Sequence, residues 1–221
     1  YFGNGKYLKF IVNTIERLLP EMNYGNSVGL HFLQLYPALL LEYSIGIIAL
    51  YAKNFEALKN LILKPSYIKE DERKSAIESL NINYVFQGPY SEFVPYKEDE
   101  GRYTRVSDYL FELFQKIFKD DIPEKQKYEE NFDIFEYIIG LIYLDKRNPG
   151  SEIENTGFPI GRFSWKYFGW GANKEKGRVI FGQFFKNYLE KLLAKGFFNG
   201  TEERFNKFRK LYEDTLSKFH W

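Results

Sequence analysis

Apolar residues recur every three or four positions along most of this chain, a spacing typical of amphipathic helices rather than of strands. The segment KYLKFIVNTIERLLPEM (residues 6–22) carries such a stripe and is broken at Pro20. Similar spacing predicts helices over residues 55–63, 105–123, 131–150, 174–195 and 201–219. Thr201 is the expected N-cap of the last helix, and two glutamates follow it in the first turn. The pattern predicts an all-α protein, an irregular bundle of about seven or eight helices.

The most apolar stretch, residues 38–52, contains a single carboxylate, Glu42. A helix of about 15 residues spans about 22 Å, which is short of the roughly 30 Å hydrocarbon core of a bilayer. We therefore expect a buried core helix that starts near Pro37 rather than a membrane span. Only a few residues separate it from the helix over 55–63, so the two should pack antiparallel. The segment GIIALYAKNFEAL resembles the middle of a tetratricopeptide hairpin, although no second copy follows at the period of about 34 residues.

The remaining segments carry weaker patterns. Residues 23–35 predict a turn into a shorter helix with Ser27 as N-cap, and the strongly charged residues 69–80 predict a solvated helix. Residues 81–102 contain Pro89, Pro95 and Gly101, and predict a loop with a short extended piece at 84–86. This loop is the best candidate for a boundary within an otherwise single domain over residues 1–221. Residues 151–178 predict a long loop rich in glycine and aromatic residues.

Composition narrows the function classes. The formal charge of +1 gives no global field that would attract nucleic acid or an anionic membrane, and the chain has no cysteine. Disulfides, thiolate zinc sites, iron–sulfur clusters and cysteine nucleophiles are thereby excluded, which fits a cytoplasmic protein. We expect no cofactor and no metal. Because the first residue is Tyr1 and no signal peptide follows, we expect a piece of a longer chain.

The loop over residues 151–178 offers a candidate binding site. It interleaves aromatic and basic side chains, and the candidate contacts are Arg162, Trp165, Lys166, Trp170, Lys174, Lys176 and Arg178. Such a mixture suits stacking on unpaired bases and neutralising phosphates. The alternative is that the aromatic rings fill a gap between helices while the charges face water. GFPIGR lacks the Gly-Lys-Ser/Thr ending of a phosphate loop, and GRFSW is not a nucleophile elbow.

Glu42 is the second candidate, because a carboxylate inside an apolar run must find a partner or hold a raised pKa. We expect a buried ion pair between Glu42 and Arg162, or a hydrogen bond from a tyrosine; a catalytic acid in a hydrolase is the further alternative. His31 also lies in an apolar segment and is interpreted as a core hydrogen-bonding residue rather than a metal ligand. Asp133 with Glu136, and Asp108 with Glu112, share helical faces in a way that is common on exposed helices.

Three stretches occur in order: YPALLLEYSIGIIAL, PIGRFSWK and GFFNGTEERFNKFRKLYEDTLSKFHW. Together they resemble a helical C-terminal region of large multidomain bacterial proteins, several of which are similar to anti-phage defence systems. The likeness covers about the first quarter and the last third of the chain. It implies a regulatory or sensing module in bacteria, and none of the motifs is diagnostic of an activity.

The sequence therefore favours a non-catalytic helical scaffold, sensor or partner-binding module over an enzyme. Its partner would be another protein or an adjacent domain of the same polypeptide, and its setting the cytoplasm. The alternative is a nucleic-acid-binding module that uses the aromatic and basic residues of 158–178.

Overall fold

Helices dominate the fold, which confirms the all-α irregular bundle expected from the apolar spacing. The computed structural model describes residues 5–19, 34–69, 72–86, 104–147, 158–169 and 173–218. The helices in this part are α1 (Gly5–Leu18), α3 (Tyr36–Tyr51), α4 (Phe55–Ile62), α5 (Ile82–Val85), α6 (Arg105–Ile117), α7 (Lys125–Lys146), α8 (Arg162–Tyr167), α9 (Lys174–Ala194) and α10 (Glu202–Leu216). The same described residues also form the 3-10 helices η1 (Ala76–Glu78) and η4 (Phe197–Gly200) and the strands β1 (Ser66–Lys69) and β2 (Glu72–Ser75).

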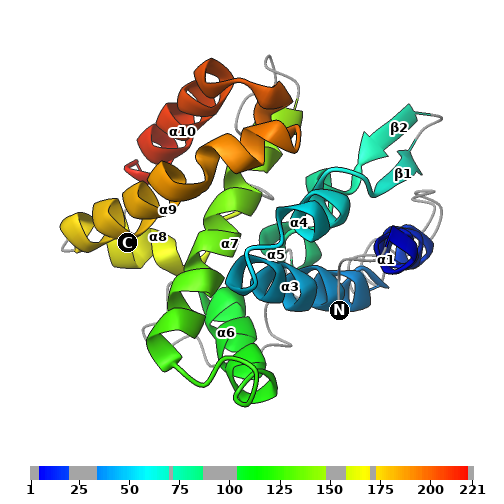
Figure 1. Cartoon of the computed structure of the whole chain (residues 1–221), viewed down its shortest axis with the longest axis horizontal. Coiled ribbons are helices and arrows are strands. Elements are labelled where there is room, and N and C mark those ends of the chain that lie inside the picture. Colours follow the sequence, from blue (N-terminus) through cyan, green and yellow to red (C-terminus); the bar gives the residue numbers. More distant parts are fainter. Residues whose placement is uncertain are drawn as a thin grey trace.

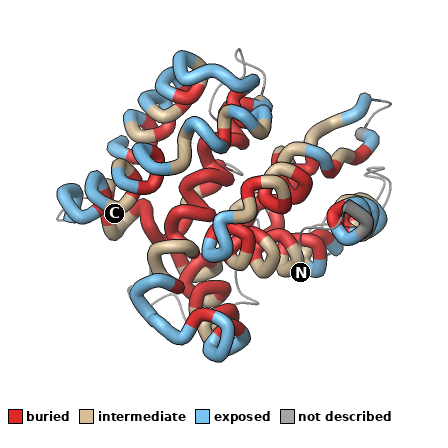
Figure 2. Tube along the Cα trace, viewed as in Figure 1, coloured by how far each residue is buried: buried red, intermediate tan, exposed pale blue. Residues whose placement is uncertain are grey.

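Helix α7 runs through the centre of the molecule, and α3, α6, α8 and α10 pack against it from different sides (Figure 1). Its residues are buried without interruption from Phe132 to Asp145. The tube in Figure 2 shows this helix buried along most of its length, whereas α9 and α10 turn exposed residues outward. Because α7 is buried on every side over this stretch, the other helices pack around it, and α7 organises the core.

Two glycines allow neighbouring helices to approach α7 closely. A Cβ atom on Gly46 of α3 would lie 2.1 Å from the ring of Phe135, and one on Gly140 of α7 would lie 2.1 Å from the ring of Tyr212 on α10. Both distances are far below van der Waals contact. Glycine at these two helix crossings therefore leaves room for the aromatic rings of Phe135 and Tyr212, which occupy the space that a larger side chain would need.

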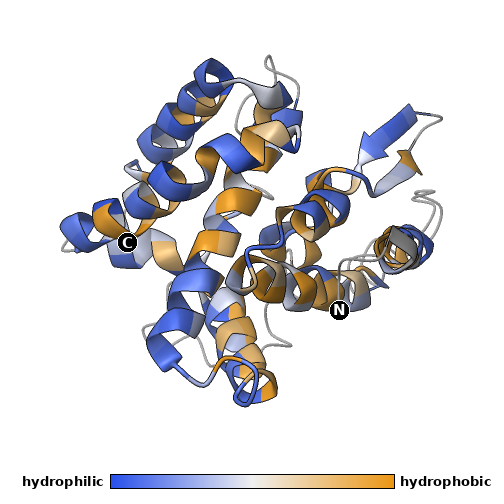
Figure 3. Ribbon diagram, in the orientation of Figure 1, coloured by the Kyte–Doolittle hydropathy of each residue, from blue (hydrophilic) through white to orange (hydrophobic). Residues whose placement is uncertain are grey.

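The most apolar stretch forms α3, with Pro37 in its first turn, and it is a buried core helix as expected (Figure 3). Within the described residues, no helix is long and apolar enough to cross a bilayer. The side chain of Asn54 accepts a hydrogen bond from the backbone N–H of Ala57 and opens α4 directly after α3. The two helices of the expected hairpin are therefore present and packed together; their tetratricopeptide character stays a prediction.

The prediction of a charged helix over residues 69–80 is wrong. Strands β1 and β2 form an antiparallel hairpin there, with Tyr67 opposite Lys74, and η1 follows. The first half of the charged segment has no apolar residue at helical spacing, so a helix would have buried nothing. In the hairpin, Tyr67 is buried and its hydroxyl lies 2.6 Å from Ser79 Oγ.

Two more expectations need correction. Residues 84–86 are not extended: Tyr84 and Val85 end the short helix α5, and Phe86 is its C-cap. The helix begins after Asn81, whose side chain accepts hydrogen bonds from the N–H groups of Asn83 and Tyr84. The loop over residues 151–178 contains helix α8. Thr201 does occupy the N-cap of α10, but its hydroxyl donates to the Phe198 carbonyl instead of capping the helix.

Several expectations fall outside the described residues. These are the short helix capped by Ser27, the role of His31, the stacking position of Trp170 and the loop beyond residue 86 that was the candidate domain boundary.

Candidate functional site

Helix α8 brings Arg162, Trp165 and Lys166 against the middle of the bundle. The helix starts directly after Gly161, where a Cβ atom would lie 2.1 Å from Glu136 Oε2 on α7. Phe163 points into the aromatic core and is fully buried. Because residues four apart share one face of a helix, Arg162 and Lys166 both lie along α7.

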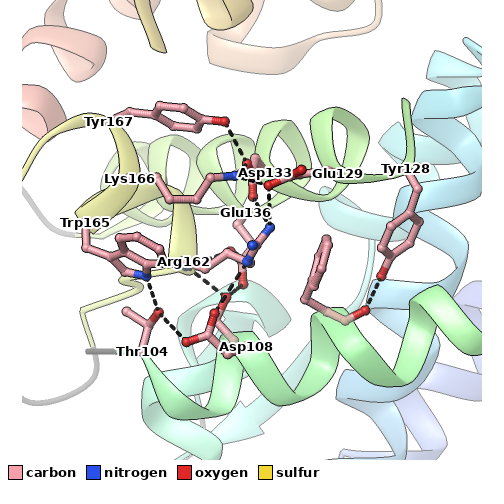
Figure 4. A network of polar contacts seen from close by, with 12 residues as sticks. Thr104, Asp108, Tyr128, Glu129, Asp133, Glu136, Arg162, Trp165, Lys166 and Tyr167 are labelled. Atoms are coloured by element: carbon pink, nitrogen blue, oxygen red, sulfur yellow. Dashed lines mark hydrogen bonds and ion pairs between the residues drawn. The ribbon is translucent and has the colours of Figure 1, made fainter. Parts of the chain in front are cut away.

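Arg162 is the centre of a polar network (Figure 4). Its Nε lies 3.5 Å from Asp108 Oδ1 on α6, and its Nη1 lies 3.3 Å from Asp133 Oδ1 and 3.4 Å from Glu129 Oε1 on α7. The guanidinium also stacks over the Phe111 ring, 3.7 Å from the ring centre. Burial alone would lower the pKa of Arg162, but the nearby carboxylates overcome this effect and raise the pKa, so the guanidinium stays charged.

Lys166 and Tyr167 extend the network along α7. The Lys166 Nζ lies 2.6 Å from Glu129 Oε1 and also forms an ion pair with Asp133. The hydroxyl of Tyr167 donates to Asp133 Oδ2 at 3.2 Å. Burial raises the pKa of the Asp133 carboxyl even with Lys166 and Arg162 beside it. The pKa of Glu129, which is less deeply placed, is lowered by Lys166 and Arg162 in spite of its partial burial.

Trp165 is engaged inside the protein as well. Its indole Nε1 donates to Thr104 Oγ1 at 3.1 Å, at the start of α6 (Figure 4). The indole therefore helps to attach α8 to α6, and its polar edge points inward.

Glu136 has a buried carboxyl group that contacts three other helices. Its Oε1 accepts hydrogen bonds from Tyr43 at 3.0 Å and Ser107 at 2.6 Å, and its Oε2 accepts from the backbone N–H of Arg162 at 3.1 Å. Burial raises the pKa of Glu136 to about 8, and the nearby Asp133 adds to the shift. A general acid must reach a substrate, whereas the side chains of Tyr43 and Ser107 that bind Glu136 are themselves buried. The arrangement joins α3, α6, α7 and α8 rather than offering a proton to a ligand.

The prediction of an ion pair between Glu42 and Arg162 is wrong. Arg162 pairs with carboxylates of α6 and α7, which are its immediate neighbours. Glu42 is buried in α3, and its Oε2 has no hydrogen-bond partner among the described residues. Burial raises the pKa of the Glu42 carboxyl well above its ordinary value, which favours the uncharged form. Its surroundings are those of a core residue rather than of an open catalytic pocket.

The remaining candidates lie on the first two turns of α9, and two of them line a pocket. Lys174, Lys176 and Arg178 are exposed. A pocket of about 390 Å³ between α8, α9 and α10 is lined by Lys174 and Arg178, and also by Arg209 and Glu213 of α10. Lys176 does not line it. The structure thus divides six of the seven candidates into an inner group, Arg162, Trp165 and Lys166, and an outer group on α9, Lys174, Lys176 and Arg178. The seventh candidate, Trp170, lies outside the described residues.

A second hollow lies on another face of α9. This groove, of about 630 Å³, runs between α7 and α9 and is closed at one end by the end of α3. Leu50, Ile134 and Phe184 are buried in its floor, whereas Val179 is 59% exposed and Tyr51 37% exposed on its edge. Polar side chains of α7 and α9 border the rest.

The sequence pattern placed two carboxylates of the network, Asp133 and Glu136, in an exposed environment that the structure does not show. Asp133 and Glu136 resembled a pair on an exposed helix, yet Asp133 is fully buried and Glu136 nearly so. The signal that could have found them is the one that selected Glu42: a carboxylate within an apolar run, here FDIFEYIIGLIYL. Arg209 and Glu213 gave no such signal, because they lie on a helix with many charges.

No group of His, Asp or Glu residues within the described residues is arranged to hold a metal ion. No protein-family model, no curated protein and no solved structure matches the chain. The resemblance to bacterial defence proteins therefore stays a prediction, and the geometry has to support a function by itself.

Proposed function

We propose that this chain is a non-catalytic, cytoplasmic helical module that binds an amphipathic helix of a protein partner in the groove between α7 and α9. The observation that carries the proposal is the groove itself: two helices form its walls, its floor is apolar, and large apolar side chains stay exposed on its edge. Exposed apolar surface next to an apolar groove is typical of a site for a partner helix.

The dimensions suit a helix. The residues of α9 that line the groove run from Val179 to Tyr188, which corresponds to about 14 Å at 1.5 Å per residue. That length accommodates about two and a half turns of a second helix. Such a helix would place apolar residues at i, i+3, i+4 and i+7 on the floor formed by Leu50, Ile134 and Phe184.

The charges at the closed end indicate which helix would fit. The ammonium groups of Lys53 and Lys191 lie 5.6 Å and 5.7 Å from the ring centre of Tyr188. Neither lysine forms an ion pair with the part of the chain that the structure describes. We therefore expect the partner helix to carry acidic residues at the end that meets Lys53.

The test is a selection of helical peptides of about 16 residues against the protein, followed by binding measurements on variants. We expect the selected peptides to have an apolar stripe and acidic residues at one end. Val179→Glu should weaken their binding by about tenfold or more, and Lys53→Glu should weaken it too. Ile117→Glu is the matched control, because Ile117 is similarly exposed, at 55%, on α6.

Three outcomes would overturn the proposal: no enriched peptide, peptides that bind the Val179→Glu variant as tightly as the original chain, or self-association of the protein through this groove. Sedimentation of the original chain and of Val179→Glu detects the last of these.

The nucleic-acid alternative has less support than the groove. Arg162 and Lys166 are neutralised by carboxylates within the network, and the Trp165 Nε1–H is bound to Thr104. What still supports it is the exposed cluster of cations on the first turns of α9.

A further inference from the structure

The pocket between α8, α9 and α10 is a second site, on a different face of α9 from the groove, and nothing in the proposed function requires it. We propose that this pocket binds a small molecule that carries a phosphate group and a planar ring, as a mononucleotide does. Its volume of about 390 Å³ lies at the lower end of the range for small-molecule sites, roughly 300 to 1,000 Å³.

Three cations converge on the pocket from two helices. Lys174 and Arg178 are four residues apart and lie on the same face of α9, and Arg209 lines the pocket from α10. Neither Lys174 nor Arg178 forms an ion pair with any described residue. Cations that line one pocket without counter-ions repel each other, and a bound anion would relieve that repulsion.

Arg209 is held in a fixed orientation at this site. Its Nε donates to Glu213 Oε1 at 2.9 Å, and Glu213 also accepts a hydrogen bond from the buried Tyr137 at 2.7 Å. The guanidinium carries further N–H groups that suit the two oxygens of a phosphate. With Glu213 as the only carboxylate among the described lining residues, two positive charges remain in excess, which matches a phosphate monoester of about −1.5 to −2 at neutral pH.

Parallel aromatic rings form the apolar side of the pocket. Phe168 and Phe181 both line it, and their planes differ by 21° at 6.2 Å between ring centres. Tyr137 stacks behind Phe181 at 4.3 Å and 13°. Phe181 is buried and Phe168 is half-buried, so a planar ligand ring would extend the stack at Phe168. Base–aromatic stacking contributes about 1–3 kcal/mol in nucleic-acid complexes. This requirement separates a nucleotide from a free phosphate ion.

Calorimetric titration of the whole chain tests the proposal, with AMP, inorganic phosphate and adenosine as separate probes. We expect AMP to bind more tightly than phosphate and adenosine, because only AMP supplies both parts. Arg178→Gln and Lys174→Gln should each weaken AMP binding by about tenfold. Lys176→Gln is the matched control: it removes the same charge from the same turn of α9, but from outside the pocket.

The proposal fails if AMP gives no binding, if AMP binds no better than phosphate, or if Lys176→Gln weakens binding as much as Lys174→Gln. It also fails if a single-stranded oligonucleotide without a terminal phosphate binds more tightly than AMP, since that result favours a surface for the nucleic-acid backbone. The two sites can be separated, because Val179→Glu should leave AMP binding unchanged and Arg178→Gln should leave peptide binding unchanged.

Discussion

Arg162 and Lys166 on α8, and Lys174 and Arg178 on α9, form two pairs of cations with the same four-residue spacing and with opposite surroundings. The first pair is largely enclosed and forms ion pairs with carboxylates of α6 and α7. These carboxylates are Asp108, Glu129 and Asp133, and Glu136 adds a further electrostatic interaction. The second pair is exposed and shares its pocket with one carboxylate, Glu213, which is already paired to Arg209.

The difference shows that the partners supplied by other helices decide what a cation does. A buried guanidinium surrounded by carboxylates holds elements together, because removing it leaves charges without compensation. An exposed cation beside a pocket contributes little to folding and stays free to bind an anion. Mutation of each group can therefore test the assignment.

The largest effect is expected from Arg162→Met. This change leaves Asp108 and the fully buried Asp133 without their guanidinium, and should lower the free energy of unfolding by about 3–5 kcal/mol. Urea denaturation followed by circular dichroism measures it. A loss below about 1 kcal/mol would place these ion pairs in the class of surface pairs and remove the distinction between the two cation pairs.

The pH dependence of stability should come next in size. Burial raises the pKa of Glu136 to about 8 in the folded protein, from an ordinary value of 4.5. Between these values the folded state binds more protons than the unfolded state, so stability falls as the pH rises, by at most about 1.4 kcal/mol per pH unit. The contribution is complete below the lower value and lost above the higher one.

The Glu136→Gln variant isolates that contribution, because an amide cannot ionise. Urea denaturation across this pH window should give a smaller slope for the variant than for the original chain. Equal slopes would show that Glu136 does not titrate there, and would shift attention to Glu42, whose pKa burial also raises.

A smaller effect, of opposite sign, is expected from Glu42→Leu. Its Oε2 has no hydrogen-bond partner among the described residues, so a leucine should raise stability by about 1 kcal/mol. Glu136→Leu is the contrasting variant. It removes the acceptor of Tyr43 and Ser107 and should destabilise the fold. A destabilising Glu42→Leu would indicate that this carboxyl has a partner after all.

The smallest effect is expected from Arg178→Met, which repeats the first substitution in the exposed pair. The free energy of unfolding should change by no more than about 0.5 kcal/mol, measured by the same urea titration. A loss close to that of Arg162→Met would mean that the α9 cations are structural, and would contradict their assignment to a binding pocket.

The local spacing of apolar residues predicted the all-α class and most of the helices. It could do so because the apolar residues that a helix buries lie within that helix's own sequence. They failed at residues 69–80, where the hairpin depends on the burial of Tyr67 rather than on local charge. The pairing in the network could not be derived either. Arg162 is 54 residues from Asp108 and 29 from Asp133, and no periodicity carries information over such separations.

The sequence could not separate the enclosed candidate residues from the exposed ones. The interleaved cations and aromatic rings drew attention to α8 and the start of α9, but the spacing of the cations is identical in the enclosed and the exposed pair. Only the carboxylates of α6 and α7 separate the two groups. Those carboxylates resembled surface residues because Asp133 and Glu136 lie three apart, a spacing that exposed helices also use.

The burial of α7 from Phe132 to Asp145 has a consequence for how the chain tolerates variation. A helix at a protein surface accepts polar residues at regular intervals, where each turn faces water. Along α7 from Phe132 to Asp145 every side of the helix faces a neighbouring element. The regular alternation of tolerant and intolerant positions is therefore not expected there. A systematic scan of polar replacements should therefore record an unbroken block of intolerance there, and that block would identify the central helix from mutational data alone.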